Sequence, residues 1–150
     1  MAIPQKDAFV NVSNSRPGTY EEVIRQIEKD KVCPFCPDQL KKYHKNPILA
    51  ETPRWIVTTN MYPYKGAKTH ALFIHKEHIV GLQELSADAW KEFHELIAQF
   101  ISERKIPGGT ALMRFGDTKY TGASVNHLHA HLISSDPDQK DYAPVLARVG

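Results

Sequence analysis

The sequence of 150 residues has few of the features that mark secreted or membrane proteins. It contains only 2 cysteines, too few for the disulfide framework of a small secreted domain. No apolar run approaches the roughly 20 residues that a membrane-spanning helix needs. The first residues, MAIPQKDAFVNV, lack the basic and apolar regions of a signal peptide. We therefore expect a protein of a reducing compartment, the cytoplasm, with no membrane partner.

An excess of charge of one sign is also missing. The 19 Lys and Arg residues against 17 Asp and Glu residues give a net charge of +2, which is too small to indicate a nucleic-acid polymer as partner. With 41% hydrophobic and 24% charged residues, the composition is that of a globular protein and excludes disordered, collagenous and coiled-coil chains. We expect a polar N-terminal arm over 1–17, one domain over 18–135 and a polar tail over 136–150.

Two segments carry helical patterns. Thr19 begins the first, with Glu22 three residues later as the partner in a capping box. Ser86 is the predicted N-cap of a second, longer helix, which ends before Pro107. Four apolar residues recur at helical spacing in this longer helix and are expected in the core: Trp90, Phe93, Ile97 and Phe100.

Four segments are rich in residues that favour strands, namely 54–59, 71–74, 110–115 and 123–133. Prolines confine the segment 33–47 to loops and one short turn. Only one helix separates consecutive strands, so a regular alternation of strands and helices is not favoured. The predicted fold class is α+β: an antiparallel sheet of about five strands, with a long helix and a shorter N-terminal helix packed on one face.

The 2 cysteines lie together in the motif Cys33-Pro34-Phe35-Cys36. Three interpretations are open: half of a structural zinc site that needs two further ligands, a redox dithiol, or two inert thiols. Thioredoxin-like dithiols follow an apolar strand, whereas the segment 21–31 predicts a charged amphipathic helix. The zinc site is therefore the favoured interpretation.

The most informative segment is 124–133, in which His127, His129 and His131 alternate with apolar residues. On a strand, alternate side chains point to opposite faces, so the three imidazoles would share one face. Packing does not explain such a row. The first and third rings would lie roughly 13 Å apart, so one metal ion cannot bind all three. A ring left over could attack phosphorus and carry the group covalently.

This segment resembles the His-φ-His-φ-His-φ-φ signature of the histidine-triad superfamily of nucleotide hydrolases and transferases. Three further stretches match in the same order. Cys33 and Cys36 resemble a zinc half-site of bacterial members, 69–79 resembles Gly-His-φ-Leu-φ-φ-Pro-Lys-x-His-φ, and 122–125 resembles Gly-x-Ser/Thr-Val. The resemblance covers about residues 33–133. It implies the fold of this family, a nucleotide substrate, with a purine nucleoside phosphate expected, and possible homodimers.

The resemblance also implies a mechanism. His129 would attack the α-phosphorus of a nucleotide ester, anhydride or phosphoramidate, and the nucleotidyl group would then pass to water or another acceptor. His131 would donate to a phosphate or leaving-group oxygen, and His70 would line the same cleft. Ser124 would direct its hydroxyl at the leaving group, which requires a bend near Gly122, because a regular strand would turn Ser124 away from the histidines.

Two candidate substrate-binding residues depart from the family pattern, and Gly122 is a third candidate. Asn60 stands where the family has an acidic ribose-binding residue, in a segment that resembles diadenosine polyphosphate phosphorylases and uridylyltransferases. Arg114 replaces an Asn-x-Gly element and is either a ligand for an additional phosphate or a surface cation. Three functions stay open: a hydrolase, a nucleotidyltransferase or dinucleoside polyphosphate phosphorylase, and a non-catalytic nucleotide- and zinc-binding module.

The resemblance completes the metal site. In zinc-bearing members, two cysteines join a histidine at the Lys-x-His position and the first triad histidine. Here these residues are Cys33, Cys36, His78 and His127, a set suited to a structural Zn²⁺ with no open position. His44, in the loop after Cys36, stays as an alternative ligand.

Overall fold

The computed structural model describes residues 8–150, and an antiparallel sheet forms its centre. The five strands lie in the order β1-β2-β3-β5-β4, and every neighbouring pair is antiparallel. Their bounds are β1 (Ile48–Glu51), β2 (Trp55–Thr59), β3 (Ala67–His75), β4 (Thr110–Met113) and β5 (His129–Ser135). The α+β class and the five-stranded antiparallel sheet are thus confirmed.

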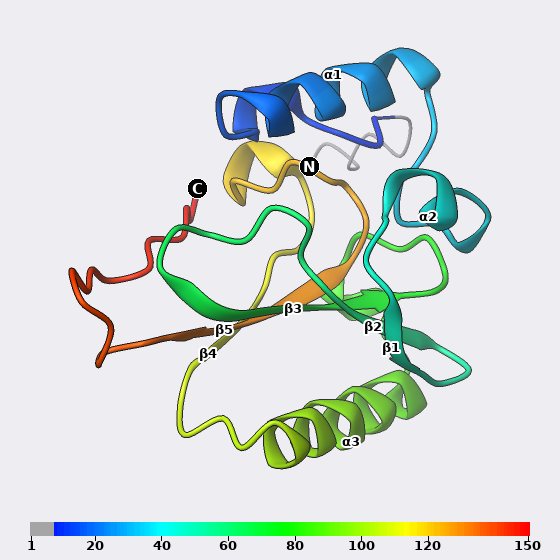
Figure 1. Cartoon of the computed structure of the whole chain (residues 1–150). Helices are drawn as coiled ribbons and strands as arrows, with labels where there is room; N and C mark the ends of the chain where they lie inside the picture. Colours follow the sequence, from blue (N-terminus) through cyan, green and yellow to red (C-terminus); the bar gives the residue numbers. More distant parts are fainter. Residues whose placement is uncertain (1–7) are drawn as a thin grey trace.

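Helices cover both faces of this sheet, α3 (Ala87–Glu103) on one and α1 (Thr19–Asp30) and α2 (Pro37–Tyr43) on the other (Figure 1). Three short 3₁₀ helices, Val12–Asn14, Leu82–Glu84 and Thr118–Tyr120, lie in the connections. The expectation that the helices pack on one face is wrong. The apolar stretches of β2 and β3 run through consecutive residues, which is typical of strands buried on both faces.

Alternate residues of the central strands divide the core into two layers. Toward α3 lie Trp55, Val57, Ala71, Phe73, Leu128, Ala130 and Leu132, packed on Ala89, Leu96 and Phe100. Toward α2 lie Ile56, Leu72 and Ile74, packed on Leu40. The prediction that the apolar partners of the triad histidines face a core is therefore confirmed. The α3 layer is the larger one, and it includes the apolar residues that alternate with the triad histidines.

Several local predictions need correction. The N-cap of α1 is Gly18, at φ +103° and without a side-chain hydrogen bond, so Thr19 forms no capping box. The loop segment 33–47 contains α2, because Pro37 lies in the first turn, where proline costs no hydrogen bond. Trp90 is 43% exposed rather than in the core, although its ring still contacts Phe93. The strand β5 begins only at His129, so His127 lies in the irregular segment before it.

The remaining helix prediction holds. The Ser86 hydroxyl accepts a hydrogen bond from Ala89 N at 3.1 Å and caps α3. Within residues 8–150, no helix combines the length and the apolar character needed to cross a membrane. The arm expected over 1–17 falls partly outside the described residues, and the domain limits stay a prediction. After β5, the tail over 136–150 contains no helix or strand.

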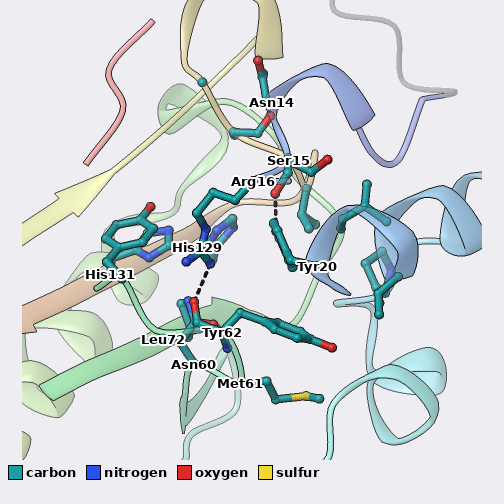
Figure 2. A pocket seen from close by; sticks show the side chains of 18 of the residues that line it. Asn14, Ser15, Arg16, Tyr20, Asn60, Met61, Tyr62, Leu72, His129 and His131 are labelled. Atoms are coloured by element: carbon teal, nitrogen blue, oxygen red, sulfur yellow. Dashed lines mark hydrogen bonds between the residues drawn. The ribbon is translucent and has the colours of Figure 1, made fainter. Parts of the chain in front are cut away.

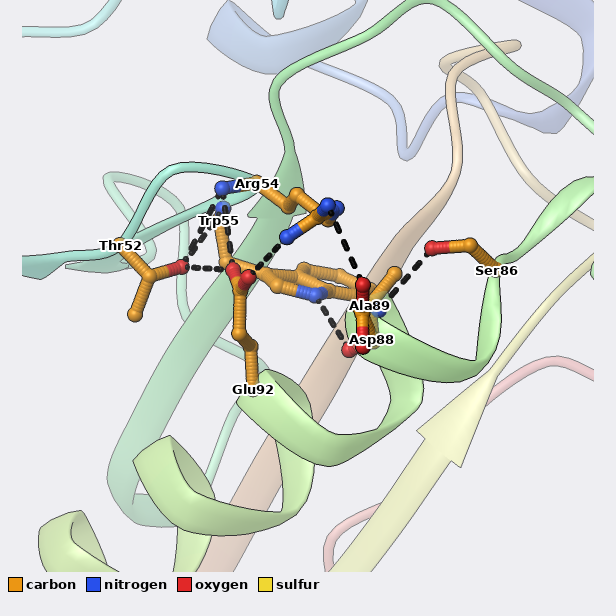
Figure 3. A network of polar contacts seen from close by, with 7 residues as sticks. All are labelled: Thr52, Arg54, Trp55, Ser86, Asp88, Ala89 and Glu92. Carbon is orange, nitrogen blue, oxygen red and sulfur yellow. Dashed lines mark hydrogen bonds and ion pairs between the residues drawn. The ribbon is translucent and has the colours of Figure 1, made fainter.

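A polar network ties the start of β2 to the first turns of α3 (Figure 3). The Glu92 carboxylate accepts hydrogen bonds from Thr52 Oγ1 at 2.6 Å, from Arg54 N at 3.0 Å and from the Arg54 guanidinium. The indole of the fully buried Trp55 donates to Ala89 O at 2.8 Å. The hydrogen bonds to Glu92, that of Thr52 above all, hold the pKa of this carboxyl below its usual value of 4.5.

Replacing Glu92 by Ala should lower the free energy of unfolding at pH 7 by about 1–2 kcal/mol, because Thr52 and Arg54 lose a charged acceptor. The folded-state pKa of Glu92 is lowered, so its contribution is complete above pH 4.5 and disappears as the pH falls through the folded value. Urea unfolding at pH 7 and at pH 3 measures both. Glu95→Ala, an exposed change on the same helix, should cost less than about 0.5 kcal/mol. An equal loss for Glu92→Ala at both pH values would contradict this account.

Candidate active site and metal centre

A cavity of about 540 Å³ lies between α1 and the sheet (Figure 2). Its walls come from the N-terminal arm, α1, the loop after β2, the segment 122–125, the triad and the C-terminal tail. Among the described residues, no Asp or Glu lines it, whereas three arginines do: Arg16, Arg114 and Arg148. An uncompensated cluster of guanidinium groups indicates an anionic ligand.

The ring of His129 is fixed in one tautomer. Its Nδ1 lies 2.6 Å from the backbone oxygen of His127, and because a carbonyl only accepts, Nδ1 carries the hydrogen. Nε2 therefore has the lone pair, and it has no hydrogen-bond partner in the part of the chain that the structure describes. Burial lowers the pKa of His129 to about 4, so the ring is neutral at neutral pH. A neutral imidazole with an unoccupied lone pair beside a cavity is suited to nucleophilic attack.

His70 and His131 form a pair beside this ring. His70 Nε2 lies 2.8 Å from His131 Nδ1, an arrangement set by the pairing of β3 with β5. Burial lowers the pKa of His70 to about 4 and the pKa of His131 well below its usual value. Three further donors approach the pair: the backbone N–H of Tyr64, the Asn60 amide and the Arg114 guanidinium.

This group has more hydrogen-bond donors than acceptors. The backbone N–H of Tyr64 lies 3.1 Å from His70 Nδ1, the Asn60 Nδ2 lies 3.2 Å from His70 Nε2, and Arg114 Nη1 lies 3.3 Å from His131 Nε2. Each neutral ring offers one lone pair. No choice of tautomers satisfies these three contacts and the one between the rings, so at least two N–H groups always face each other. An oxyanion placed among them would accept the surplus hydrogens.

The two predicted substrate contacts Asn60 and Arg114 lie in different surroundings. The Asn60 side-chain oxygen accepts from Tyr62 N at 2.8 Å, which turns its amide nitrogen toward His70. Arg114 is half-buried beside His131, donates to the Arg148 backbone oxygen at 2.7 Å and has a buried Nε without a partner among the described residues. Of the two interpretations of Arg114, its position agrees with a phosphate contact rather than with an isolated surface cation.

The four predicted metal ligands come together in one cluster. The ligand atoms of Cys33, Cys36, His78 and His127 all lie within 4.8 Å of one another. Cys33 Sγ is 3.2 Å from His127 Nδ1, Cys36 Sγ is 3.5 Å from His78 Nδ1, and the two Nδ1 atoms are 3.2 Å apart. The alternative ligand His44 lies elsewhere, with its Nε2 2.8 Å from the Thr58 hydroxyl.

Comparisons with known proteins identify the family of the chain. Residues 32–142 match the family model described as scavenger mRNA decapping enzyme C-term binding. The chain belongs to this family and to the histidine-triad superfamily. No curated protein sequence matches it.

Solved structures of the histidine-triad superfamily resemble the chain. A protein named "Hit Like Protein" is 25% identical at a TM-score of 0.55, over 65% of this chain and 93% of that protein. An HIT family hydrolase from Clostridium thermocellum is 24% identical at a TM-score of 0.54, over 67% and 89%. A histidine triad nucleotide-binding protein from Candida albicans is 21% identical at a TM-score of 0.55, over 73% and 81%. The last two support the fold. Family membership supports a nucleotide hydrolase or transferase at the level of the superfamily.

The donor set of this histidine-triad protein fits a zinc ion. Tetrahedral zinc with nitrogen and sulfur ligands places neighbouring ligand atoms roughly 3.3–3.8 Å apart, close to the distances between the cysteine and histidine atoms. The Nε2 of His127 donates to the backbone oxygen of His75, which leaves the Nδ1 lone pair for the metal. Burial raises the pKa of the Cys33 thiol to about 12 and also raises that of Cys36.

The stretch that resembles the family's Gly-x-Ser/Thr-Val element has a bend near Gly122, which the predicted role of Ser124 requires. Gly122 has φ +72°, in the left-handed region that side chains disfavour. Beyond the bend, Ser124 lines the cavity together with His129 and His131. Its hydroxyl is hydrogen-bonded to the hydroxyl of Tyr20. A regular strand would have turned Ser124 away, and the segment before His129 is not one.

Sequence motifs missed four residues that line the cavity: Arg16, Tyr20, Tyr64 and Arg148. Arg16 donates to the backbone oxygens of Tyr62 and Pro63, and its guanidinium lies 5.1 Å from the ring centroids of Tyr20 and Tyr64. Arg16 and Tyr20 lie outside every family motif. Arg16 belongs to the predicted polar arm and Tyr20 to the predicted first helix, and neither pattern indicates a cavity residue. Tyr64 belongs to the segment Asn60-Met61-Tyr62-Pro63-Tyr64, so its place in the loop after Asn60 was the one available signal.

Gly122→Ala should lower the free energy of unfolding by about 1–3 kcal/mol, because alanine is strained at a positive φ. Its Cβ would also lie 2.9 Å from Arg148 Cγ. Urea denaturation followed by tryptophan fluorescence measures the change. Gly108→Ala is the matched control, since no atom lies within 4 Å of its added Cβ and its φ is not positive. A loss for Gly122→Ala no larger than the control's would refute the strain at this bend.

Proposed function

We propose that the protein is a nucleotidyl hydrolase in which His129 attacks the α-phosphorus of a nucleotide ester, anhydride or phosphoramidate. The observation that carries the proposal is the His129 ring. Its Nδ1–H is held by the His127 backbone oxygen at 2.6 Å, and its Nε2 has no hydrogen-bond partner within residues 8–150 and belongs to a ring that lines a cavity without carboxylates. The neutral, oriented ring needs no separate base to attack.

The reaction proceeds in two steps. In the first, the Nε2 lone pair forms a bond to phosphorus, the bond from phosphorus to the leaving group breaks, and the leaving group takes its electron pair. The positive charge that develops on the imidazole is stabilised by the Nδ1–H bond to the His127 oxygen. In the second, water attacks phosphorus and the phosphorus–nitrogen bond breaks with its electron pair returning to Nε2. One proton of the water passes to solvent, and a nucleoside monophosphate leaves with the ring neutral again.

The donor surplus around His70 and His131 supports the binding of the phosphate. The surplus N–H groups, including that of Arg114 beside His131, would donate to the non-bridging phosphate oxygens, which carry the negative charge of the phosphate. Asn60 supports this group through His70 and offers no charge to a ribose.

Part of the cavity wall is apolar and supports a nucleoside base, for which a purine is expected. Val23 and Ile27 of α1 line it with Phe35 and Met61. Flat aliphatic and aromatic walls of this kind bury a planar ring without selecting it by hydrogen bonds. The same cavity would thus hold the base against these apolar residues and the α-phosphate beside His129.

We further propose a structural Zn²⁺ bound by Cys33, Cys36, His78 and His127. When bound, it supplies a tetrahedral cross-link and no catalytic water, since all four positions are filled by the protein. His127 has three roles: its Nδ1 faces the ligand cluster, its Nε2 donates to the His75 oxygen, and its backbone oxygen orients His129. The metal site would therefore hold the peptide unit that fixes the nucleophile.

His129→Ala should abolish the release of AMP from adenosine 5′-phosphoramidate, with a fall in kcat of about 10³-fold or more, since the nucleophile is removed. Product formation is followed by chromatography, with and without inorganic phosphate, because a nucleoside diphosphate would reveal transfer rather than hydrolysis. His94→Ala, an exposed change on α3, is the control and should keep full activity. Full activity in His129→Ala would refute the mechanism, and binding of AMP by a wild-type protein that turns nothing over would support the non-catalytic module.

Protein purified without chelators should contain about one zinc per chain, and Cys36→Ser or His78→Gln should lower the content below about a tenth of that. Elemental analysis measures the metal, and thermal unfolding shows whether its loss destabilises the fold. His44→Gln is the matched control, because His44 lies in the same region but outside the ligand cluster, and it should keep the zinc. Retention of zinc by His78→Gln, or its loss in His44→Gln, would refute this ligand set.

A further inference from the structure

The hydroxyl of Tyr20 meets Ser124 at the wall of the cavity. The two hydroxyl oxygens are within hydrogen-bond distance. Among the described residues, neither hydroxyl has another side-chain hydrogen-bond partner. Tyr20 comes from the first turn of α1, 104 positions away from Ser124. Figure 2 shows its side chain near that of Arg16 at the cavity that His129 and His131 also line.

Contacts of the ring hold Tyr20 in place independently of its hydroxyl. The ring centroid lies 5.0 Å from that of Tyr62, and the Arg16 guanidinium lies 5.1 Å from it. Phenylalanine could make the same ring contacts. Packing of α1 therefore does not account for a tyrosine at this position, and the hydroxyl needs a reason of its own.

The chemistry of the two hydroxyls gives the bond a direction. A phenol, with a usual pKa near 10, is a far stronger acid and a better donor than an aliphatic alcohol. Tyr20 therefore donates to Ser124 Oγ, and the hydroxyl hydrogen of Ser124 is left for another acceptor. Burial raises the pKa of Tyr20, so this donor stays protonated at neutral pH. Accepting a hydrogen bond also makes the Ser124 hydroxyl a better donor in turn.

We propose that Tyr20 is a positioning residue for the departure of the leaving group. By donating to Ser124 Oγ, it directs the Ser124 hydroxyl hydrogen into the cavity and toward the atom that leaves phosphorus. That hydrogen bond stabilises the negative charge on the departing atom, no bond to Ser124 forms or breaks, and the departing group takes its final proton from water. The inference rests on the proposed function, since it concerns the first step of the His129 reaction.

Two substrates that share a nucleoside and differ in the leaving group test this role. In the adenosine 5′-phosphate ester of 4-nitrophenol the leaving group carries its charge without help, whereas in the methyl ester it does not. Tyr20→Phe should lower kcat about tenfold for the methyl ester and less than about twofold for the 4-nitrophenyl ester, with little change in KM. Ser124→Ala should show the same pattern, and the double variant should lose no more than Ser124→Ala.

Tyr43→Phe is the matched control, because Tyr43 also lines the cavity but its hydroxyl donates to Asp30. It should change the rates of the two esters by the same factor. For Tyr20→Phe, an equal loss on both esters, no loss on either, or losses that add to those of Ser124→Ala would each overturn the role of Tyr20 while the His129 mechanism stands. If the wild type turns over neither ester, the role of Tyr20 fails. If the wild type also releases no AMP from the phosphoramidate, or if His129→Ala is as active as the wild type, the proposed function fails with it.

Discussion

The hydrogen bond between His129 Nδ1 and the His127 backbone oxygen is the constraint on which the site depends. It decides which ring nitrogen carries the hydrogen, and thus which one can bind phosphorus. The His127 peptide unit is itself held by side-chain contacts to the His75 oxygen and to the cysteines. One residue therefore links the proposed metal centre to the proposed nucleophile, and the pairing of Ile74 with His129 fixes the position of the nucleophile in the sheet.

Much of this arrangement could be predicted from the sequence, because the decisive signals are local. The alternation from His127 to Leu132 places the imidazoles and the apolar residues on different sides, and the core confirms it. However, the strand was predicted over 123–133, whereas β5 begins only at His129. His127 leaves the strand because its ring faces cysteines more than 90 positions away, and no local pattern records such a contact. Among the described residues, the cluster of candidate metal ligands that includes His127 contains Cys33, Cys36 and His78 and neither His129 nor His131.

The parts that could not be predicted are those set by the packing of distant segments. Arg16 lies in a stretch that is polar and rich in turns, and Tyr20 lies in the first turn of α1. Both line the cavity because α1 covers the face of the sheet opposite α3 (Figure 1). Trp90 shows the reverse. Its spacing fits the apolar stripe of α3, but it lies at the margin of the core, where the sheet no longer covers it. Helical spacing gives a direction from the helix axis and not the extent of the surface that the helix meets.

The contact between Arg114 and the C-terminal tail has a consequence for selectivity. The Arg148 backbone oxygen already accepts a hydrogen bond from the guanidinium, so a ligand that takes this donor replaces one acceptor by another. A neutral oxygen gains almost nothing from such an exchange, whereas a charged oxygen gains the difference between a neutral and a charge-assisted hydrogen bond. A ligand at Arg114 would therefore compete with the Arg148 backbone oxygen for the same donor, and this competition would favour anionic oxygens over neutral ones.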